Sequence, residues 1–321
     1  MRDEPFDTSS ISSNNTDNLI CDSKGRIWAG TANHGLNLYI PGKVGFQHFF
    51  SGQVNGTLAS NIITCLYEDS KGTIWVGTGN GLHRVIETKI GDQIEFTFEN
   101  ISLKTNPEDS VTDKYINVIT SDDDRRLWIG SYAGLFKLEL NEDVRKVPET
   151  VWFSKKNNRI NNYVVFTITI DKSGKVWAAG RNGIDIISYP GESIRYISAF
   201  GKNQTGMAGN LVTSLFTASN GDVWVGYNDQ GVQVVRNVYP TSPVLDTIRF
   251  ERISLVSPLN SLSKGHAISF WEDRITKGLI WIGFNAGGVV RLIPITKNFV
   301  TNNLIASPIS SPFVTCLLKQ N

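Results

Sequence analysis

The sequence predicts an all-β fold, a β-propeller of four-stranded antiparallel blades, from three observations. A pattern of about fifty residues recurs six times along the 321 residues. Each copy holds short runs of β-branched and apolar residues separated by turn residues. No 3.6-residue periodicity of an amphipathic helix lies between them. The number of blades stays open between six and seven, because a partial seventh repeat follows the sixth.

The repeated motif is a tight turn followed by a tryptophan. In the second copy it reads DSKGTIWVG and ends at Gly77. An aspartate at the start of such a turn can hydrogen-bond its own backbone, and the glycine supplies a positive φ. A second glycine and an apolar residue follow, here Gly81 and Leu82. The motif tryptophans of the six copies are Trp28, Trp75, Trp128, Trp177, Trp224 and Trp281.

The second copy also sets the limits of the four strands in one blade. They are predicted at Asn61–Glu68, Thr73–Thr78, Leu82–Glu87 and, after a variable loop, Ile94–Phe98. Four such strands in about fifty residues are the unit of a propeller. We therefore expect the six motif tryptophans to be structural core residues between blades, and the glycines to form turns.

The repeats predict one propeller domain over residues 1–321. They cover approximately residues 14–50, 61–99, 114–153, 162–198, 210–253 and 266–300, with a partial copy at 311–321. In that partial copy, residues 313–318 (FVTCLL) look like a seventh first strand. Either this strand pairs into the first blade and closes a six-bladed ring, or the chain is a fragment of a seven-bladed ring. We favour the fragment.

Composition excludes several classes of function. Hydrophobic residues make up 40%, aromatic residues 10% and charged residues 19%, and the formal net charge is +1. This balance argues against a nucleic-acid partner. No apolar run approaches the ~18 residues of a membrane span, so no direct membrane insertion is expected. The first fifteen residues lack the apolar core of a signal peptide. The three cysteines are interpreted as small buried thiols.

The pattern D-x-x-G-x-[IL]-W-[IV]-G-[TS]-x-x-G-L, preceded by an N-x-[IV] strand, resembles the two-component regulator propeller repeat. Residues 61–82 (NIITCLYEDSKGTIWVGTGNGL) are close to a consensus copy, and the resemblance covers about residues 14–318. It implies the extracytoplasmic, periplasmic sensor region of a sensor kinase or related receptor. Many such propellers are thought to sense oligosaccharides. Members usually continue into an immunoglobulin-like domain, a membrane helix and an output module, so kinase activity is not assigned to these residues.

Function is expected in the loops, because the repeat does not fix them. In a propeller, the connections between the second and third strands emerge on the same face as those between successive blades. The predicted ligand-binding residues there are Asn33, His34, Asn80, Tyr132, Arg181, Asn182, Asn228, Asp229, Gln230, Asn285 and His266. Asn61, Tyr115, Asn162 and Asn210 stand at the starts of first strands on the same face. Amides and aromatic rings suit a neutral polyhydroxyl ligand, although asparagine and glycine are also common turn residues.

No catalytic motif, metal site or cofactor site is predicted. The sequence contains no G-x-S-x-G, Walker, HExxH or CxxC pattern. The four histidines are far apart in the sequence, although His34 and His266 could both face the channel. The carboxylates of residues 122–124 lack the spacing of a calcium loop and are interpreted as a solvated turn.

Three functions remain open. The first, which we favour, is a non-catalytic ligand-sensing propeller of a bacterial two-component receptor, acting as a homodimer or beside a neighbouring propeller and binding a small molecule or an oligosaccharide. The second is a protein-interaction scaffold, which a large exposed apolar patch would favour. The third is a propeller lyase or glycosidase, which would require a histidine–carboxylate or two-carboxylate arrangement in the channel.

Overall fold

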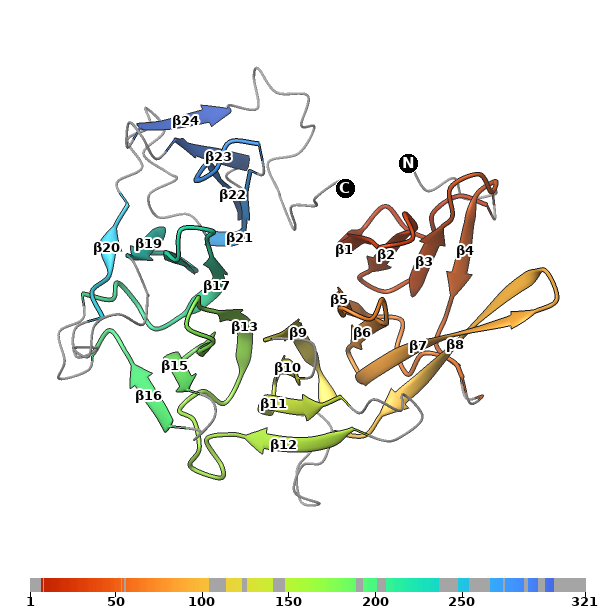
Figure 1. The fold of residues 1–321 in the computed structure, drawn as a ribbon, viewed down its shortest axis with the longest axis horizontal. Coiled ribbons are helices and arrows are strands. Elements are labelled where there is room, and N and C mark those ends of the chain that lie inside the picture. Colours follow the sequence, from red (N-terminus) through yellow and green to blue (C-terminus); the bar gives the residue numbers. More distant parts are fainter. Residues whose placement is uncertain are drawn as a thin grey trace. The chain divides into compact units, whose positions relative to one another are not determined.

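A computed structural model describes residues 7, 9–52, 54, 56–103, 114–122, 126–140, 148–188, 193–200, 206–236, 248–253, 266–273, 275–285, 288–293 and 298–302. These residues form 24 β-strands arranged in six four-stranded antiparallel sheets, the blades of a β-propeller (Figure 1). The described part of the chain includes no helix with the length and apolar character needed to cross a bilayer. The predicted fold class is confirmed.

The chain divides into two compact units, the first ending at Trp152 and the second beginning at Phe153. Three blades belong to the first unit, although the last strand of blade 3 runs one residue past its end. Blade 1 contains β1 (Thr16–Cys21), β2 (Ile27–Thr31), β3 (Leu36–Tyr39) and β4 (Phe46–Phe49). Blade 2 contains β5 (Ile63–Glu68), β6 (Ile74–Thr78), β7 (Gly81–Ile90) and β8 (Gln93–Ile101). Blade 3 contains β9 (Ile116–Ser121), β10 (Arg126–Ser131), β11 (Gly134–Glu139) and β12 (Glu149–Phe153).

The second unit contains blades 4 to 6. Blade 4 contains β13 (Val165–Ile170), β14 (Val176–Gly180), β15 (Gly183–Ser188) and β16 (Ser193–Ile197). Blade 5 contains β17 (Val212–Thr217), β18 (Val223–Tyr227), β19 (Val232–Val235) and β20 (Glu251–Arg252). Blade 6 contains β21 (His266–Glu272), β22 (Ile280–Asn285), β23 (Gly288–Ile293) and β24 (Asn298–Asn302).

The aspartate of the repeated turn holds the turn and the tryptophan together. In blade 2, Oδ1 of Asp69 accepts the backbone N–H groups of Lys71 at 3.0 Å and Thr73 at 2.9 Å. Its Oδ2 accepts the indole N–H of Trp75 at 2.9 Å. The same indole bond recurs from Trp28 to Asp22, from Trp128 to Asp122 and from Trp177 to Asp171. The carboxylate therefore satisfies the one polar group that a buried tryptophan brings into the core.

Blades 5 and 6 depart from this arrangement. Ala218 occupies the aspartate position of blade 5, yet the turn closes through the same backbone bond, from Gly221 N to Ala218 O at 2.9 Å. The indole nitrogen of Trp224 is buried there without a hydrogen-bond partner among the described residues. In blade 6 the turn is two residues longer, and Trp281 is half-buried, whereas the other five motif tryptophans are buried.

The glycine two residues after the tryptophan does not form a turn, contrary to the prediction. Gly77 lies inside β6, and Gly226 lies inside β18. A Cβ atom on Gly77 would overlap the Cys65 sulfur and lie 2.8 Å from Cγ2 of Ile116, which belongs to the next blade. At Gly77 no side chain fits, because the innermost strand of the neighbouring blade passes directly over it.

Other predicted details change or fall outside the described residues. No variable loop separates β7 from β8, which are joined by a turn at Gly91 and Asp92. The Asp122 side chain is only 3% exposed and is paired with Arg126, so it is not a solvated turn residue. Residues 123–125 and the predicted strand at 313–318 lie outside the described residues. The sheet of blade 1 has its four strands without that segment.

Candidate functional site

The predicted binding loops are bonded to one another through their backbones. In the first unit, Gly35 N donates to Asn61 O at 2.9 Å and Tyr132 N donates to Tyr115 O at 3.1 Å. In the second unit, Gly183 N donates to Asn210 O at 2.9 Å. These bonds place the turns between second and third strands beside the linkers between blades. We call this side of each unit its loop face. The backbone groups in these bonds are already paired, so the side chains of the turns are the groups considered for a ligand.

A stacked tyrosine pair lies on the loop face of the first unit. The rings of Tyr115 and Tyr132 are 4.7 Å apart between centroids and inclined by 28°. Tyr132 is 41% exposed, and Tyr115 lies half-buried beneath it. Burial raises the pKa of Tyr115, and the neighbouring Tyr132 and Asp17 raise it further. Burial also raises the pKa of Asp17 on β1. Tyr115 therefore stays protonated at neutral pH. The phenol hydroxyls of the pair can donate as well as accept hydrogen bonds.

Several predicted asparagines have their side chains committed to the fold. Asn61 accepts the backbone N–H of Ser51 at 2.7 Å, and Asn210 accepts that of Ala199 at 2.7 Å. Buried Asn162 bonds the carboxylate of Asp185 at 2.8 Å.

Two asparagines of the predicted binding set also bond linker backbone. The side chain of Asn182 donates to Asn161 O at 3.0 Å. The side chain of Asn80 donates to Ala59 O at 3.4 Å. Together the five amides fix the linkers, and ligand contact by Asn80 and Asn182 stays a prediction.

Other predicted residues point into solvent from these turns. Asn33, His34, Asn228, Asp229 and Asn285 are exposed, and Gln230 is half-buried. No side-chain hydrogen bond or ion pair is recorded for these six within the described ranges. They are available to a ligand, and their role stays a prediction.

The loop face of the second unit carries a cation beside aromatic rings. The guanidinium carbon of Arg181 lies 5.8 Å from the ring centroid of Phe166 on β13. The hydroxyl of Tyr196 donates to Asn182 O at 2.6 Å, and Tyr163 is 55% exposed. His266 begins β21 opposite Asn285, and burial lowers its pKa. Within the described residues, no group of three or more histidine, cysteine, aspartate or glutamate side chains is arranged to hold a metal ion.

Sequence reasoning missed a bulge that recurs in the innermost strand of every blade. On β5, Ile63 pairs with Thr78 and Cys65 with Gly77, so Thr64 has no partner in the ladder. The equivalent residues of the other five blades are Asp17, Asn117, Phe166, Thr213 and Ile268. All six are partly exposed, and they are polar in the first unit. A bulge redirects a side chain, and only the pairing reveals it, so no local sequence signal could have marked these positions.

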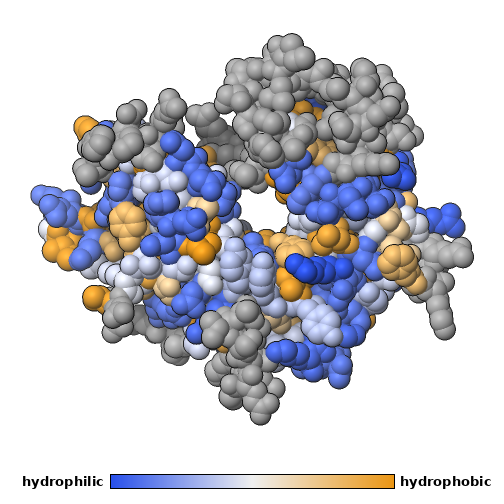
Figure 2. Space-filling view, turned by 180° about the vertical axis from the view of Figure 1, so that it is seen from behind, coloured by the Kyte–Doolittle hydropathy of each residue, from blue (hydrophilic) through white to orange (hydrophobic). Residues whose placement is uncertain are grey.

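Hydrophobic side chains on the described surface are scattered. Figure 2 shows mostly hydrophilic residues with small separate hydrophobic patches on the face that it presents. Among the exposed large hydrophobic residues are Ile90 and Ile94 near the tip of the β7–β8 hairpin, and Phe200 in the linker after β16. On the described residues of this face, no broad apolar surface is visible (Figure 2).

The comparisons with known proteins agree with the repeat pattern. A family model described as the two component regulator propeller matches residues 57–80, which include the turn and tryptophan of blade 2. No curated protein sequence matches the chain.

Solved structures share the fold. The extracellular domain described as that of the hybrid two component system BT3049 of B. thetaiotaomicron has 22% identity and a TM-score of 0.69. The match covers 94% of this chain and 36% of that structure. The corresponding domain of BT4673 has 20% identity and a TM-score of 0.66, with 37% of it covered by 94% of this chain. The chain thus spans about a third of these two structures.

A propeller of another function is also similar. Virginiamycin B lyase of Staphylococcus aureus has 14% identity and a TM-score of 0.58, with 83% of it covered by 89% of this chain. At this identity the likeness shows the fold and not the activity. The chain is therefore a β-propeller that carries the two component regulator propeller repeat.

Proposed function

We propose that this chain is a non-catalytic, ligand-sensing propeller in the extracytoplasmic, periplasmic part of a bacterial two-component signalling receptor, and that its ligand is an oligosaccharide. The repeat family supports the receptor assignment, and structural neighbours described as extracellular domains of hybrid two component systems support the location. The chain covers about a third of those two structures, so the proposal concerns sensing and assigns no output activity to these residues.

The observation that carries the proposal is the tyrosine pair on the loop face of the first unit. Tyr132 offers an exposed ring face that Tyr115 holds in place from below. A sugar ring packs its C–H groups against such a face, and its hydroxyls bond to nearby acceptors. Asp17 supplies a carboxylate close enough to affect the pKa of Tyr115. The two rings are already stacked on each other, and such preorganisation lowers the entropy cost of binding.

Signalling through this site is a matter of differential binding. A ligand shifts a receptor between two arrangements only by as much as its affinity differs between them. We propose that the two arrangements belong to a homodimer, or to this propeller and a neighbouring one. No bond of the ligand is broken in this mechanism.

The test is a thermal-shift scan against oligosaccharide classes, followed by calorimetric titration of the class that raises Tm. A ligand at 100 times its dissociation constant adds about 2.7 kcal/mol of stability. Tyr132→Ala is expected to weaken binding about fivefold, since one aromatic contact contributes about 1 kcal/mol. Phe200→Ala removes an 89% exposed aromatic ring outside the platform and is expected to bind normally. Equal affinity in Tyr132→Ala and the parent chain would refute the platform.

A second candidate, a protein-interaction scaffold, is favoured by the β7–β8 hairpin. These strands have 10 and 9 residues, whereas β3 and β4 of blade 1 have four each. Near the hairpin tip, Ile90 is 58% exposed and Ile94 is 48% exposed. If the hairpin joins two copies, Ile94→Glu lowers the sedimentation coefficient at high protein concentration. An unchanged coefficient would remove this role.

A further inference from the structure

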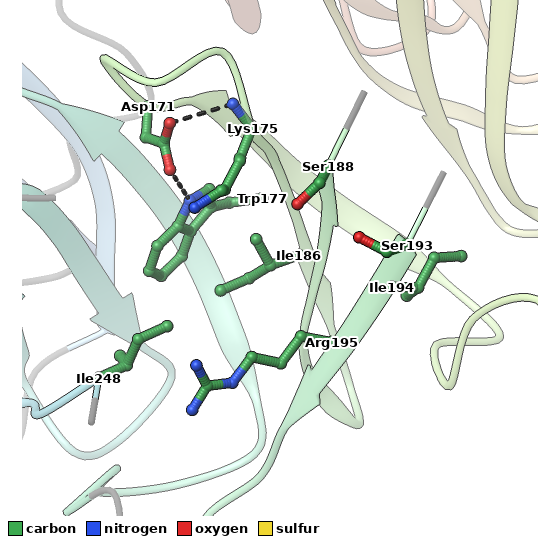
Figure 3. A pocket seen from close by; sticks show the side chains of 9 residues that line it. All are labelled: Asp171, Lys175, Trp177, Ile186, Ser188, Ser193, Ile194, Arg195 and Ile248. Atoms are coloured by element: carbon green, nitrogen blue, oxygen red, sulfur yellow. Dashed lines mark hydrogen bonds between the residues drawn. The ribbon is translucent and has the colours of Figure 1, made fainter. Parts of the chain in front are cut away.

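A cavity of about 310 Å³ lies in the second unit, at the junction of blades 4 and 5 (Figure 3). Trp177, Ile186 and Ile248 form apolar walls. Lys175 and Arg195 bring positive charge to it, and Figure 3 draws both side chains beside these walls. We call this the blade 4 cavity. It lies at the strand ends that carry the Asp171 turn, opposite the loop face, so it is separate from the site proposed above.

In the first unit, side chains fill the equivalent junction, which lies between blades 1 and 2. By strand register, Trp28 corresponds to Trp177 and Arg26 to Lys175. Phe96 of blade 2 occupies the position that Ile248 has in blade 5. The Trp28 and Phe96 rings meet edge to face at 5.5 Å, and the Arg26 guanidinium lies 5.5 Å from each ring centroid. A tight aromatic cluster with a cation over it thus occupies the position.

The cation of the first unit is also neutralised, unlike its counterpart. Arg26 forms ion pairs with Asp22 at 2.6 Å and with Glu87 at 2.7 Å. Among the described residues, none forms an ion pair or a hydrogen bond with the ammonium group of Lys175. Isoleucine at position 248 is smaller than the equivalent Phe96 and leaves space at the junction. Lysine at position 175 leaves a charge that is not neutralised as that of Arg26 is.

The one carboxylate in the cavity wall is already engaged. Asp171 accepts the N–H and hydroxyl of Ser173 at 2.8 and 2.6 Å, and the backbone N–H of Lys175 at 3.0 Å. It also accepts the indole N–H of Trp177 at 2.8 Å. The lining also holds the ammonium group of Lys175, beside these apolar walls. An apolar chamber with an unneutralised ammonium group in its lining favours an anion that has an apolar body.

We propose that the blade 4 cavity binds a small organic carboxylate with an aromatic or aliphatic body. Its carboxylate pairs with the ammonium group of Lys175, and its body packs against Ile186 and Ile248. The hydroxyls of Ser188 and Ser193, which are paired across β15 and β16, line the same cavity and offer further hydrogen bonds. The volume is at the lower end of the range for small-molecule sites, so the ligand is smaller than an oligosaccharide.

The test uses phenylacetate as the probe and phenylacetamide as its neutral counterpart, titrated into the full chain by calorimetry. Phenylacetate is expected to bind saturably with a dissociation constant at or below about 1 mM, and phenylacetamide at least tenfold more weakly, since a charge-assisted hydrogen bond is lost. Lys175→Met keeps the aliphatic stem and is expected to weaken phenylacetate binding at least tenfold while leaving phenylacetamide unchanged. Lys172→Met removes an exposed lysine from the same turn and serves as the matched control.

Ile248→Phe provides an independent test, because it restores the residue that fills the junction in the first unit. It is expected to abolish binding of both probes and to raise Tm. Absence of saturable phenylacetate binding up to 10 times the expected constant would overturn the proposal. So would equal binding of the amide, or unchanged binding in Lys175→Met. Oligosaccharide binding at the loop face is measured separately in the same variants, so the failure of one site does not decide the other.

Discussion

At the scale of single residues, the turn aspartate has the clearest energetic role. Asp69 accepts hydrogen bonds from two backbone N–H groups and from the indole of Trp75, all at the turn between β5 and β6. Blade 5 shows that a hairpin with alanine in this position still forms, at the cost of an unpaired buried indole. The aspartate is therefore a stabilising group and not a condition for the turn.

Asp69→Ala is expected to lower the free energy of unfolding by about 2–3 kcal/mol, because it leaves a buried indole N–H and turn amides without their acceptor. Denaturant unfolding followed by tryptophan fluorescence measures the change. Glu95→Ala removes an exposed carboxylate from β8 and is the control, with an expected change within about 0.5 kcal/mol. A loss of similar size in both variants would contradict this role of Asp69.

The sequence predicted some of these residue roles and not others, for physical reasons. The turn signal of Asp69 and Gly72 is local, so four residues contain all that is needed to read it. The role of Gly77 depends on Ile116, which is 39 positions away and comes into contact only through blade packing. The structural role of the Asn61 amide cannot be predicted from the sequence, because its partner, the backbone N–H of Ser51, comes within reach only once the linker is folded.

At the scale of elements, the linker before blade 2 depends on a buried histidine on β7. Nε2 of His83 accepts the backbone N–H of Ala59 at 3.0 Å and lies 3.3 Å from the amide nitrogen of Asn100 on β8. Only the neutral ring can accept at this nitrogen. Burial lowers the pKa of His83 from 6.5 to about 4.

The sign of the resulting pH dependence follows from the lowered pKa. Between pH 6.5 and 4 the unfolded chain binds a proton at His83 that the folded chain does not, so stability falls as the pH falls through this window. The neutral His83 ring contributes about 3 kcal/mol to the free energy of unfolding above pH 6.5, and this stability is lost as the pH falls to 4. Unfolding midpoints measured against pH are expected to fall more steeply in the parent chain than in His83→Gln.

The matched variant for this prediction is His34→Gln, because His34 is exposed. It is expected to keep the pH profile of the parent chain. If His83→Gln shows the same acid sensitivity as the parent, the histidine does not set it, and carboxylates elsewhere account for the loss.

At the scale of the whole molecule, the described residues include four hydrophobic clusters. Two clusters lie in the first unit, around Trp28 and around Trp75, and two lie in the second unit, around Trp177 and around Trp224. Each of these clusters combines residues of neighbouring blades within its unit. We therefore expect a destabilising substitution to open mainly the unit that contains it.

A pair of equivalent substitutions tests this expectation. A Cβ atom on Gly77 overlaps Cys65 in the first unit, and one on Gly226 overlaps Ser214 and lies 2.9 Å from Cβ of Ala267 in the second. Gly77→Ala is expected to raise amide hydrogen exchange in β5–β11 and to leave β13–β19 protected. Gly226→Ala is expected to raise exchange in β13–β19 and to leave β5–β11 protected. Each substitution is expected to lower the free energy of unfolding by about 1–3 kcal/mol. Gly209→Ala is the control, because its Cβ would lie 3.2 Å from the flexible Gln230 side chain and at ordinary contact distance, 3.8 Å, from the Tyr227 ring. Equal loss of protection in both units would show a single cooperative structure.

The repeated bulge gives the scaffold a source of variation that costs little. Because the bulged residue of each innermost strand has no partner in the ladder, strand register does not fix its side chain. In blade 5 the Thr213 hydroxyl also donates to Ala267 O of blade 6 at 2.8 Å, so a hydroxyl is favoured there. The bulged positions can be exchanged within such local limits while the turn aspartates, glycines and tryptophans stay as they are. New specificities can then arise by single substitutions at these six sites, so recognition can diverge among related chains without loss of the fold.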